Sequence, residues 1–410
     1  MLTDVQRYFV DLMSAFIQKK APPRAENINW PALYKLAKDQ NLTGVVYFMA
    51  RQLDPLQQPD EDMRKRLEQD YFTTVMFGAE QDYELQQVWT EFSKHNIIHI
   101  PVKGYTIKKC WPVSDLRTMG DIDYLVHEED KDKTREILTG LAYKPKIEEE
   151  PVVSYRKGGI YLEEHHKFPY HDITTDTVKN LDNFWDYAEP VNECTYALSL
   201  EYHALLLLAH LAKHLLHCGC GIRQVMDISL YFHQYENELD WDVLFQWLDE
   251  MKLSTFALRV FSYCYYVFGL TVYFKELPED RQFFERMSAI LLENGIFGEK
   301  HTFFKSVYKL NNNYTGFNRK WHDLLALLRF AFPPYSELRL SRRYSYVDKK
   351  PWLVPAAILH RAFGGIFRKD KTLKKLVISA VSNRKTVVKQ AELYSDIGLD
   401  GKRSDADKGN

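Results

Sequence analysis

The stretch VKGYTIKKCWPVSDLRTMGDIDYLV, residues 102–126, decides the fold of the chain and the chemistry we expect from it. An apolar segment ends in Lys103-Gly104, and two aspartates, Asp121 and Asp123, occupy alternate positions where a second apolar segment begins. Glycine at a strand-to-helix junction lets the backbone approach a phosphate, and the helix N-terminus favours an anion there. The stretch therefore predicts a phosphate-binding turn followed by two carboxylates on a strand.

The two aspartates are two residues apart, so on a strand both side chains point to the same face. Neighbouring carboxylates repel each other unless a cation lies between them. Oxygen ligands at this spacing suit Mg²⁺ or Mn²⁺ bridging to the phosphates of a substrate. The alternative is a polar strand edge with two solvated acids, but aspartate is depleted in strands and these two precede the apolar pair Leu125-Val126. We therefore favour a metal site.

Phosphoryl chemistry at an activated hydroxyl calls for a third carboxylate, which bridges a metal or takes the proton. The predicted strand YLEEHHKF, residues 161–168, offers Glu163 and Glu164 on opposite faces. The face of Glu164 begins with Ile160 and should pack on a helix. We therefore expect Glu163, together with His165, to face the site.

Length and composition bound the remaining possibilities. The 410 residues exceed one ordinary core, and 45% of them are apolar, so we expect two domains or one core with a large extension. The N-terminal sequence lacks the uninterrupted apolar run of a signal peptide, and charged or histidine residues break the longest apolar runs. Five scattered cysteines suit a reducing compartment. We expect a soluble, cytoplasmic protein without a transmembrane segment.

The order of periodic segments predicts an α+β fold with a small mixed sheet embedded between helical regions. We divide the chain into an N-terminal helical segment (1–94), an α/β core (95–175), a helical domain (176–398) and a disordered tail (399–410). One long helix is expected from Asp60 to Lys94. Further elements are expected at the following positions: strands at 97–102, 121–127, 152–156 and 160–168, and helices at 105–111, 128–141, 199–217, 222–235, 241–251, 256–268, 280–293, 319–331, 351–366 and 371–394.

Two features outside the core have both a functional and a plain interpretation. His203, His210, His214 and His217 share one stripe of a helix, where they could form a zinc site with Cys218 or Cys220. We favour a stripe that packs on the α/β core, where Lys213 and His214 could contact phosphates. Residues 339–389 contain fourteen Lys or Arg and two acids, which indicates either a polyanion contact or a solvated helical face.

Several of these motifs together resemble those of the DNA polymerase β-type nucleotidyltransferase superfamily, and most closely its bacterial family of uncharacterised nucleotidyltransferases. They are Lys103-Gly104, the segment RTMGDIDYLV, Glu163-x-His165, the helical segment HLAKHLLHCGCGIRQVMD and, nearer the C-terminus, AFPPYSELRLSRRY and KKPWLVP. The sequence departs from the pattern at two positions. Tyr105 follows the glycine where the superfamily has a second small residue, and Glu164 stands where this family usually has an apolar residue.

The resemblance implies an enzyme that moves a nucleoside monophosphate from a nucleoside triphosphate to an unidentified acceptor and releases pyrophosphate. Asp121, Asp123 and Glu163 would be the catalytic residues and would hold two Mg²⁺ or Mn²⁺ ions. The residues expected to bind the nucleotide are Lys103, Gly104, Arg117, His165, Lys213 and His214. Two alternatives remain: a non-catalytic nucleotide-binding module of the same fold, and an enzyme whose acceptor is a nucleic acid bound along residues 339–389.

Overall fold

The computed structural model describes residues 2–149, 151–168, 181, 183–217, 219–270, 279–295, 350–358, 393 and 395–399. The chain divides into two compact units, Met1–Glu299 with Asp396–Leu399 and Lys300–Ser395 with Asp400–Asn410. Most described residues belong to the first unit. The domain boundaries expected at 94, 175 and 398 stay predictions. The predicted helix at 319–331, nearly all of that at 371–394 and the tail beyond Leu399 lie outside the described residues.

A five-stranded mixed sheet lies at the centre of the first unit, with the strand order β1-β2-β5-β4-β3. Its strands are β1 (His99–Pro101), β2 (Ile122–Val126), β3 (Lys144–Glu149), β4 (Val152–Lys157) and β5 (Ile160–His165). Strands β2 and β5 run parallel, and every other neighbouring pair is antiparallel. A small mixed sheet among helices confirms the predicted α+β class.

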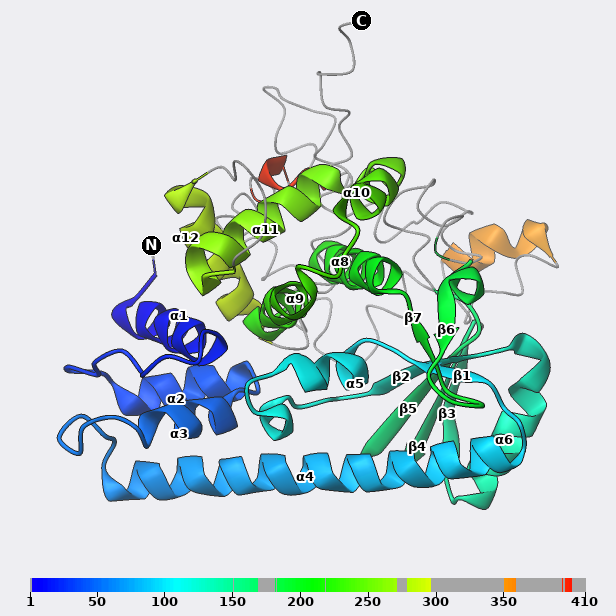
Figure 1. The fold of residues 1–410 in the computed structure, drawn as a ribbon, viewed down its shortest axis with the longest axis horizontal. Helices are drawn as coiled ribbons and strands as arrows, with labels where there is room; N and C mark the ends of the chain where they lie inside the picture. The colour runs from blue at the N-terminus through cyan, green and yellow to red at the C-terminus, as the bar shows by residue number, and fades with distance from the viewer. Residues whose placement is uncertain are drawn as a thin grey trace, which may run out of the picture. The chain divides into compact units, whose positions relative to one another are not determined.

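The long helix α4 (Glu61–Lys94) confirms the single helix predicted over this segment. It begins where the Asp60 carboxylate accepts a hydrogen bond from the backbone N–H of Met63 at 2.8 Å. Its buried residues Leu85, Val88 and Phe92 pack against the face of the sheet that carries Tyr124 and Leu162. In Figure 1 the helix runs along this side of the sheet. The opposite face of the sheet is thereby left for the carboxylates.

The remaining helices surround this centre. They are α1 (Asp4–Ile17), α2 (Trp30–Asp39), α3 (Thr43–Ala50), α5 (Gly104–Ile107), α6 (Lys131–Gly140), α8 (Leu200–His217), α9 (Ile222–Tyr235), α10 (Trp241–Glu250), α11 (Ser254–Phe268) and α12 (Arg281–Asn294). Helices α8 and α9 lie across the sheet from α4 (Figure 1), so they face Asp121 and Asp123. None of the described helices is long and apolar enough to cross a membrane. The four described cysteines are all buried and free.

The structure differs from the sequence-based expectation at several short elements. Strand β3 was not expected, because KPKIEE is highly charged and contains Pro145, where the ladder shifts register. Such residues are tolerated because β3 is an edge strand of the sheet. The hairpin of β6 (Ala188–Pro190) and β7 (Tyr196–Leu198) was also missed, since three residues are too few to show a period. The helix predicted at 105–111 is only one turn, α5, continued by a 3-10 turn.

Candidate active site

The parallel pairing of β2 and β5 brings the predicted acidic residues together. Asp123 lies opposite Glu163 in the register of the two strands, and Leu125 lies opposite His165. Side-chain ligand atoms of Asp123, Glu163 and His165 all lie within 4.8 Å of one another. Among the residues that the structure describes, this is the one cluster of three His, Cys, Asp or Glu side chains with such spacing. Asp121, immediately before β2, lines the same pocket as Asp123.

Glu163 and Glu164 have different surroundings. Glu163 is partly exposed, and its Oε2 lies 3.7 Å from Nε2 of His165. Glu164 is completely buried on the other face, where it accepts a hydrogen bond from the Tyr124 hydroxyl at 3.0 Å. A second hydrogen bond of 3.0 Å joins it to Nε2 of His166. Of the two glutamates, Glu163 is therefore the one beside Asp123.

Lys103 connects the turn before α5 to the acidic residues. Its Nζ lies 2.7 Å from Oδ1 of Asp123, and both side chains are about nine-tenths buried. Its backbone N–H donates to Nε2 of His203 at 3.2 Å. The backbone of Lys103 has φ 53° and ψ −120°, a conformation that residues with a Cβ rarely adopt. Strain of this kind persists only where the surrounding contacts hold it, and it concentrates at functional sites.

Position 104 requires glycine because another side chain of the protein lies very close to its backbone. A Cβ atom at this position would collide with the guanidinium of Arg117. Arg117 is held in place by Asp227, with Nη2–Oδ2 at 2.8 Å and Nε–Oδ1 at 3.3 Å, and Trp111 donates to the same carboxylate at 2.8 Å. The helical spacing of Arg223 and Asp227 suggests a local pair, but Asp227 instead pairs with Arg117. Sequence reasoning missed this partner because the two residues are 110 positions apart.

A pocket of about 150 Å³ opens between the sheet and helices α8 and α9; we call it the carboxylate pocket. Asp121 and Asp123 form its acidic side, with Lys103, Gly104 and Arg117 next to them. Helices α8 and α9 contribute His210, His214 and Arg223, among others. Arg223 is held there by a hydrogen bond of 2.7 Å from Nη1 to the carbonyl oxygen of Thr118. Acidic and basic side chains thus face a common space, which suits a phosphate-bearing ligand bound together with a divalent cation.

The histidine stripe of α8 does not assemble a three-ligand zinc site among the described side chains. The rings of His210 and His214 contact each other edge to face, with centroids 4.3 Å apart. Burial, the charge of Lys103 and His214 together hold the pKa of His210 well below its usual value. The predicted partner Cys218 and the side chain of His217 lie outside the described residues.

The three acids differ in the direction of their pKa shifts. Burial alone would raise the pKa of Asp123, but the charge of Lys103 and the hydrogen bond from His165 hold it well below its usual value. Burial and the charge of Asp123 raise the pKa of Asp121, although its side chain stays open to solvent at the pocket. Burial and both aspartate charges raise the pKa of Glu163 to about 7. The repulsion behind the last two shifts is what a bound cation would relieve.

Comparison with known proteins gives one match. The family model described as "Uncharacterised nucleotidyltransferase" matches residues 26–269, more than half of the 410 residues. The chain belongs to this family. The match confirms the resemblance found in the sequence, and it includes every residue of the site described above. It supports a general role in nucleotidyl transfer. No curated protein and no solved structure matches the chain.

Proposed function

We propose that this nucleotidyltransferase has a polymerase β-type core and transfers a nucleoside monophosphate from a nucleoside triphosphate to an acceptor, with release of pyrophosphate. The observation that carries the proposal is the parallel register of Asp123 and Glu163, with Asp121 two residues before Asp123 on the same chain segment. Asp121 and Asp123 line a pocket with a basic wall, and Glu163 lies beside Asp123. Family membership supports the same class of reaction.

Asp121, Asp123 and Glu163 would hold two Mg²⁺ or Mn²⁺ ions. The donor set fits, because hard divalent cations prefer carboxylate oxygens, and the raised pKa values of Asp121 and Glu163 reflect burial and also repulsion from neighbouring carboxylates. Such ions would neutralise phosphate charge and stabilise the attacking and leaving oxygens. Nε2 of His165 donates to Oδ1 of Asp123 at 2.7 Å and orients that carboxylate.

The other residues would bind the triphosphate and handle the proton. Lys103, Arg117 and Lys213 supply positive charge for phosphate oxygens, and His214 adds a polar contact from α8. The backbone at Gly104 would lie close to the phosphates, at the start of α5. Glu163, partly exposed beside Asp123, could accept the proton of an acceptor hydroxyl.

The test incubates the purified protein and a cell extract with Mg²⁺ and each nucleoside triphosphate in turn. Mass spectrometry should then find an acceptor whose mass has increased by one nucleoside monophosphate, and a coupled assay should find released pyrophosphate. The double variant Asp121→Asn with Asp123→Asn should lose both signals. The exposed acid Asp132 on α6 offers a matched control, Asp132→Asn, which should keep them. Unchanged pyrophosphate release by the double variant would contradict the metal assignment.

The same experiment separates the two alternatives. Triphosphate binding without pyrophosphate release, across many acceptors, would favour a non-catalytic nucleotide-binding module. An acceptor that proves to be a nucleic acid, bound with an affinity that falls steeply with salt, would favour the third hypothesis. That hypothesis rests on the sequence, because only residues 350–358 of the basic segment 339–389 are described.

A further inference from the structure

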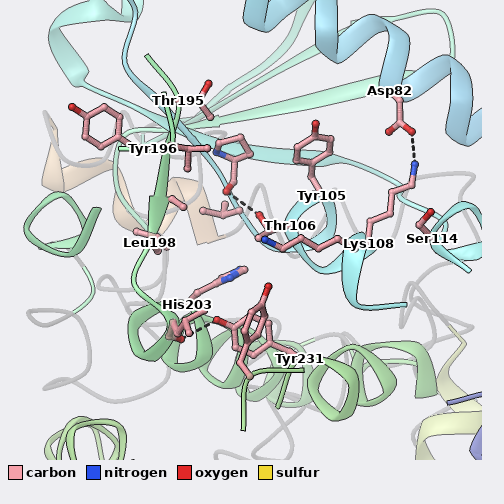
Figure 2. A pocket seen from close by; sticks show the side chains of 17 residues that line it. Asp82, Tyr105, Thr106, Lys108, Ser114, Thr195, Tyr196, Leu198, His203 and Tyr231 are labelled. Carbon is pink, nitrogen blue, oxygen red and sulfur yellow. Dashed lines mark hydrogen bonds and ion pairs between the residues drawn. The ribbon is translucent and has the colours of Figure 1, made fainter. Parts of the chain in front are cut away.

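A second and larger pocket lies beside the carboxylate pocket, with a volume of about 460 Å³. Figure 2 shows it between α5, β7 and the helix pair α8–α9. Chain segment 101–107 separates the two: Tyr105 and Thr106 line the larger pocket, whereas Lys103 and Gly104 line the carboxylate pocket. No residue lines both. The volume falls within the range of about 300–1,000 Å³ that small-molecule sites usually have.

The walls of this pocket are largely aromatic and aliphatic. Four tyrosines line it, Tyr105, Tyr196, Tyr231 and Tyr235, and we call it the tyrosine pocket. The hydroxyl of Tyr231 donates to the carbonyl oxygen of Leu200 at 2.9 Å, so it is already engaged within the protein. Aromatic walls favour a flat apolar ligand, because rings gain from stacked or edge-to-face contacts beyond simple burial.

One hydrogen-bond donor in the wall has no acceptor in the described part of the protein. His203 is only 4% exposed and lines the pocket. Burial, reinforced by the charge of Lys109, lowers its pKa to about 3, so the ring is neutral at physiological pH. Its Nε2 accepts from the backbone N–H of Lys103, which places the single ring proton on Nδ1. No described oxygen or nitrogen accepts that proton, so Nδ1–H is available to a ligand.

Positive charge lies close to this donor. Lys109 lines the pocket, is exposed, and has no ion pair with any described residue. Its charge contributes to the lowered pKa of His203, so the two groups lie near each other. The neighbouring Lys108 is different, because its Nζ pairs with Asp82 at 2.6 Å (Figure 2). A ligand with an anionic group would therefore gain a partner at Lys109.

We propose that the tyrosine pocket binds a small planar aromatic acid, whose ring lies among the tyrosines and whose carboxylate contacts Lys109 and accepts a hydrogen bond from His203. The proposal does not depend on the nucleotidyl-transfer reaction. The two sites are nevertheless connected. His203 of the tyrosine pocket accepts a hydrogen bond from the backbone N–H of Lys103, and the side chain of Lys103 donates to Asp123.

The test measures binding of benzoate, para-hydroxybenzoate and salicylate to the full chain by saturation-transfer NMR and isothermal titration. At least one acid should bind at a single site with a dissociation constant of about 1 mM or tighter. Benzamide, which has the same shape as benzoate without the charge, should bind about tenfold more weakly. Failure of all three acids to bind would overturn the proposal.

Variants then locate the site. Lys109→Gln should weaken binding about tenfold, whereas Lys35→Gln, at an exposed lysine of α2, should leave it unchanged. Ala197→Trp fills the pocket from β7 and should abolish binding, with circular dichroism confirming that the variant folds. Equal affinity of the parent and Lys109→Gln, or unchanged binding by a folded Ala197→Trp variant, would place the ligand elsewhere.

Discussion

Lys103 and Asp123 form a buried ion pair at the centre of the site, with Nζ 2.7 Å from Oδ1. The two residues come from the turn before α5 and from β2, and the pair holds the strained turn against the sheet. In a protein without a bound cation, the ammonium group supplies the positive charge that the buried carboxylate needs. Lys103 thus stabilises the site and competes with any divalent cation for Asp123.

Replacing Lys103 with methionine should test this dual role. Removing one partner of a buried pair leaves an uncompensated carboxylate, so Lys103→Met should lower the unfolding free energy by ~3 kcal/mol in EDTA. Mg²⁺ should recover part of this loss, because a cation would then neutralise Asp123. Denaturant unfolding with and without Mg²⁺ measures both effects. Lys157→Met, which removes a more exposed pair with Glu84 of the same 2.7 Å length, should cost only about 1 kcal/mol and show no Mg²⁺-dependent recovery.

Much of this site follows from local sequence pattern. The alternation after Gly120 predicts that Asp121 and Asp123 share a face, and they line one pocket. The turn Lys157-Gly158-Gly159 predicts the hairpin of β4 and β5, and Gly158 has the positive φ of 58° that such a turn favours. Period and turn chemistry act over a few residues, so a sequence shows them directly.

Long-range partners do not follow from local pattern. Nothing in the spacing of residues indicates that β5 adds to β2 in parallel and sets Glu163 opposite Asp123. The alternation along the predicted strand indicates only that Glu163, and not Glu164, faces the site. The choice of Arg117 over Arg223 as the partner of Asp227 depends on how α9 packs against the loop before β2. Both contacts are set by tertiary packing of segments that are far apart in the chain.

Glu163 and Glu164 offer a direct comparison between a proposed catalytic position and a structural one. Glu163→Gln should reduce nucleotidyl transfer by roughly 100-fold or more while leaving the fold intact, because the carboxyl is partly exposed beside the aspartates. Glu164→Gln should instead lower the unfolding free energy by about 1–3 kcal/mol, since it disturbs buried hydrogen bonds with Tyr124 and His166. Steady-state rates and chemical denaturation of both variants give the comparison. Full activity of Glu163→Gln would remove it from the mechanism.

Gly104→Ala should disturb the site through Arg117. The added methyl group must displace the Arg117 guanidinium and loosen its pair with Asp227, at a cost of about 1–3 kcal/mol in stability. Binding of a nucleoside triphosphate, measured by titration calorimetry, should weaken as well. Gly140→Ala is the matched control, because a Cβ there meets nothing within 4 Å and the change should stabilise α6 by about 0.5–1 kcal/mol. Equal stability of Gly104→Ala and Gly140→Ala would show that the Arg117 guanidinium moves aside without lowering the free energy of unfolding.

Acid should destabilise the protein through its buried histidines, and His99 is the best placed to show it. The ring is fully buried, stacks on Trp89 with centroids 4.3 Å apart, and is hydrogen-bonded at Nδ1 to the carbonyl oxygen of Ile97. Burial lowers its pKa from the usual 6.5 to about 4. Between these values the unfolded chain binds a proton that the folded chain does not. Stability is therefore fully present above pH 6.5 and falls as the pH drops toward 4.

His99→Gln should remove this difference in proton binding between the unfolded and the folded chain. The slope of unfolding free energy against pH should become shallower by up to ~1.4 kcal/mol per pH unit, the value for one proton. Guanidinium unfolding at several pH values between 6.5 and 4 measures the slope for parent and variant. His95→Gln, at an exposed histidine near the end of α4, should leave most of the slope in place. The same slope in the parent and in His99→Gln would contradict the prediction. It would mean that His99 takes up its proton equally in the folded and the unfolded chain, so that the folded chain accommodates the charged ring.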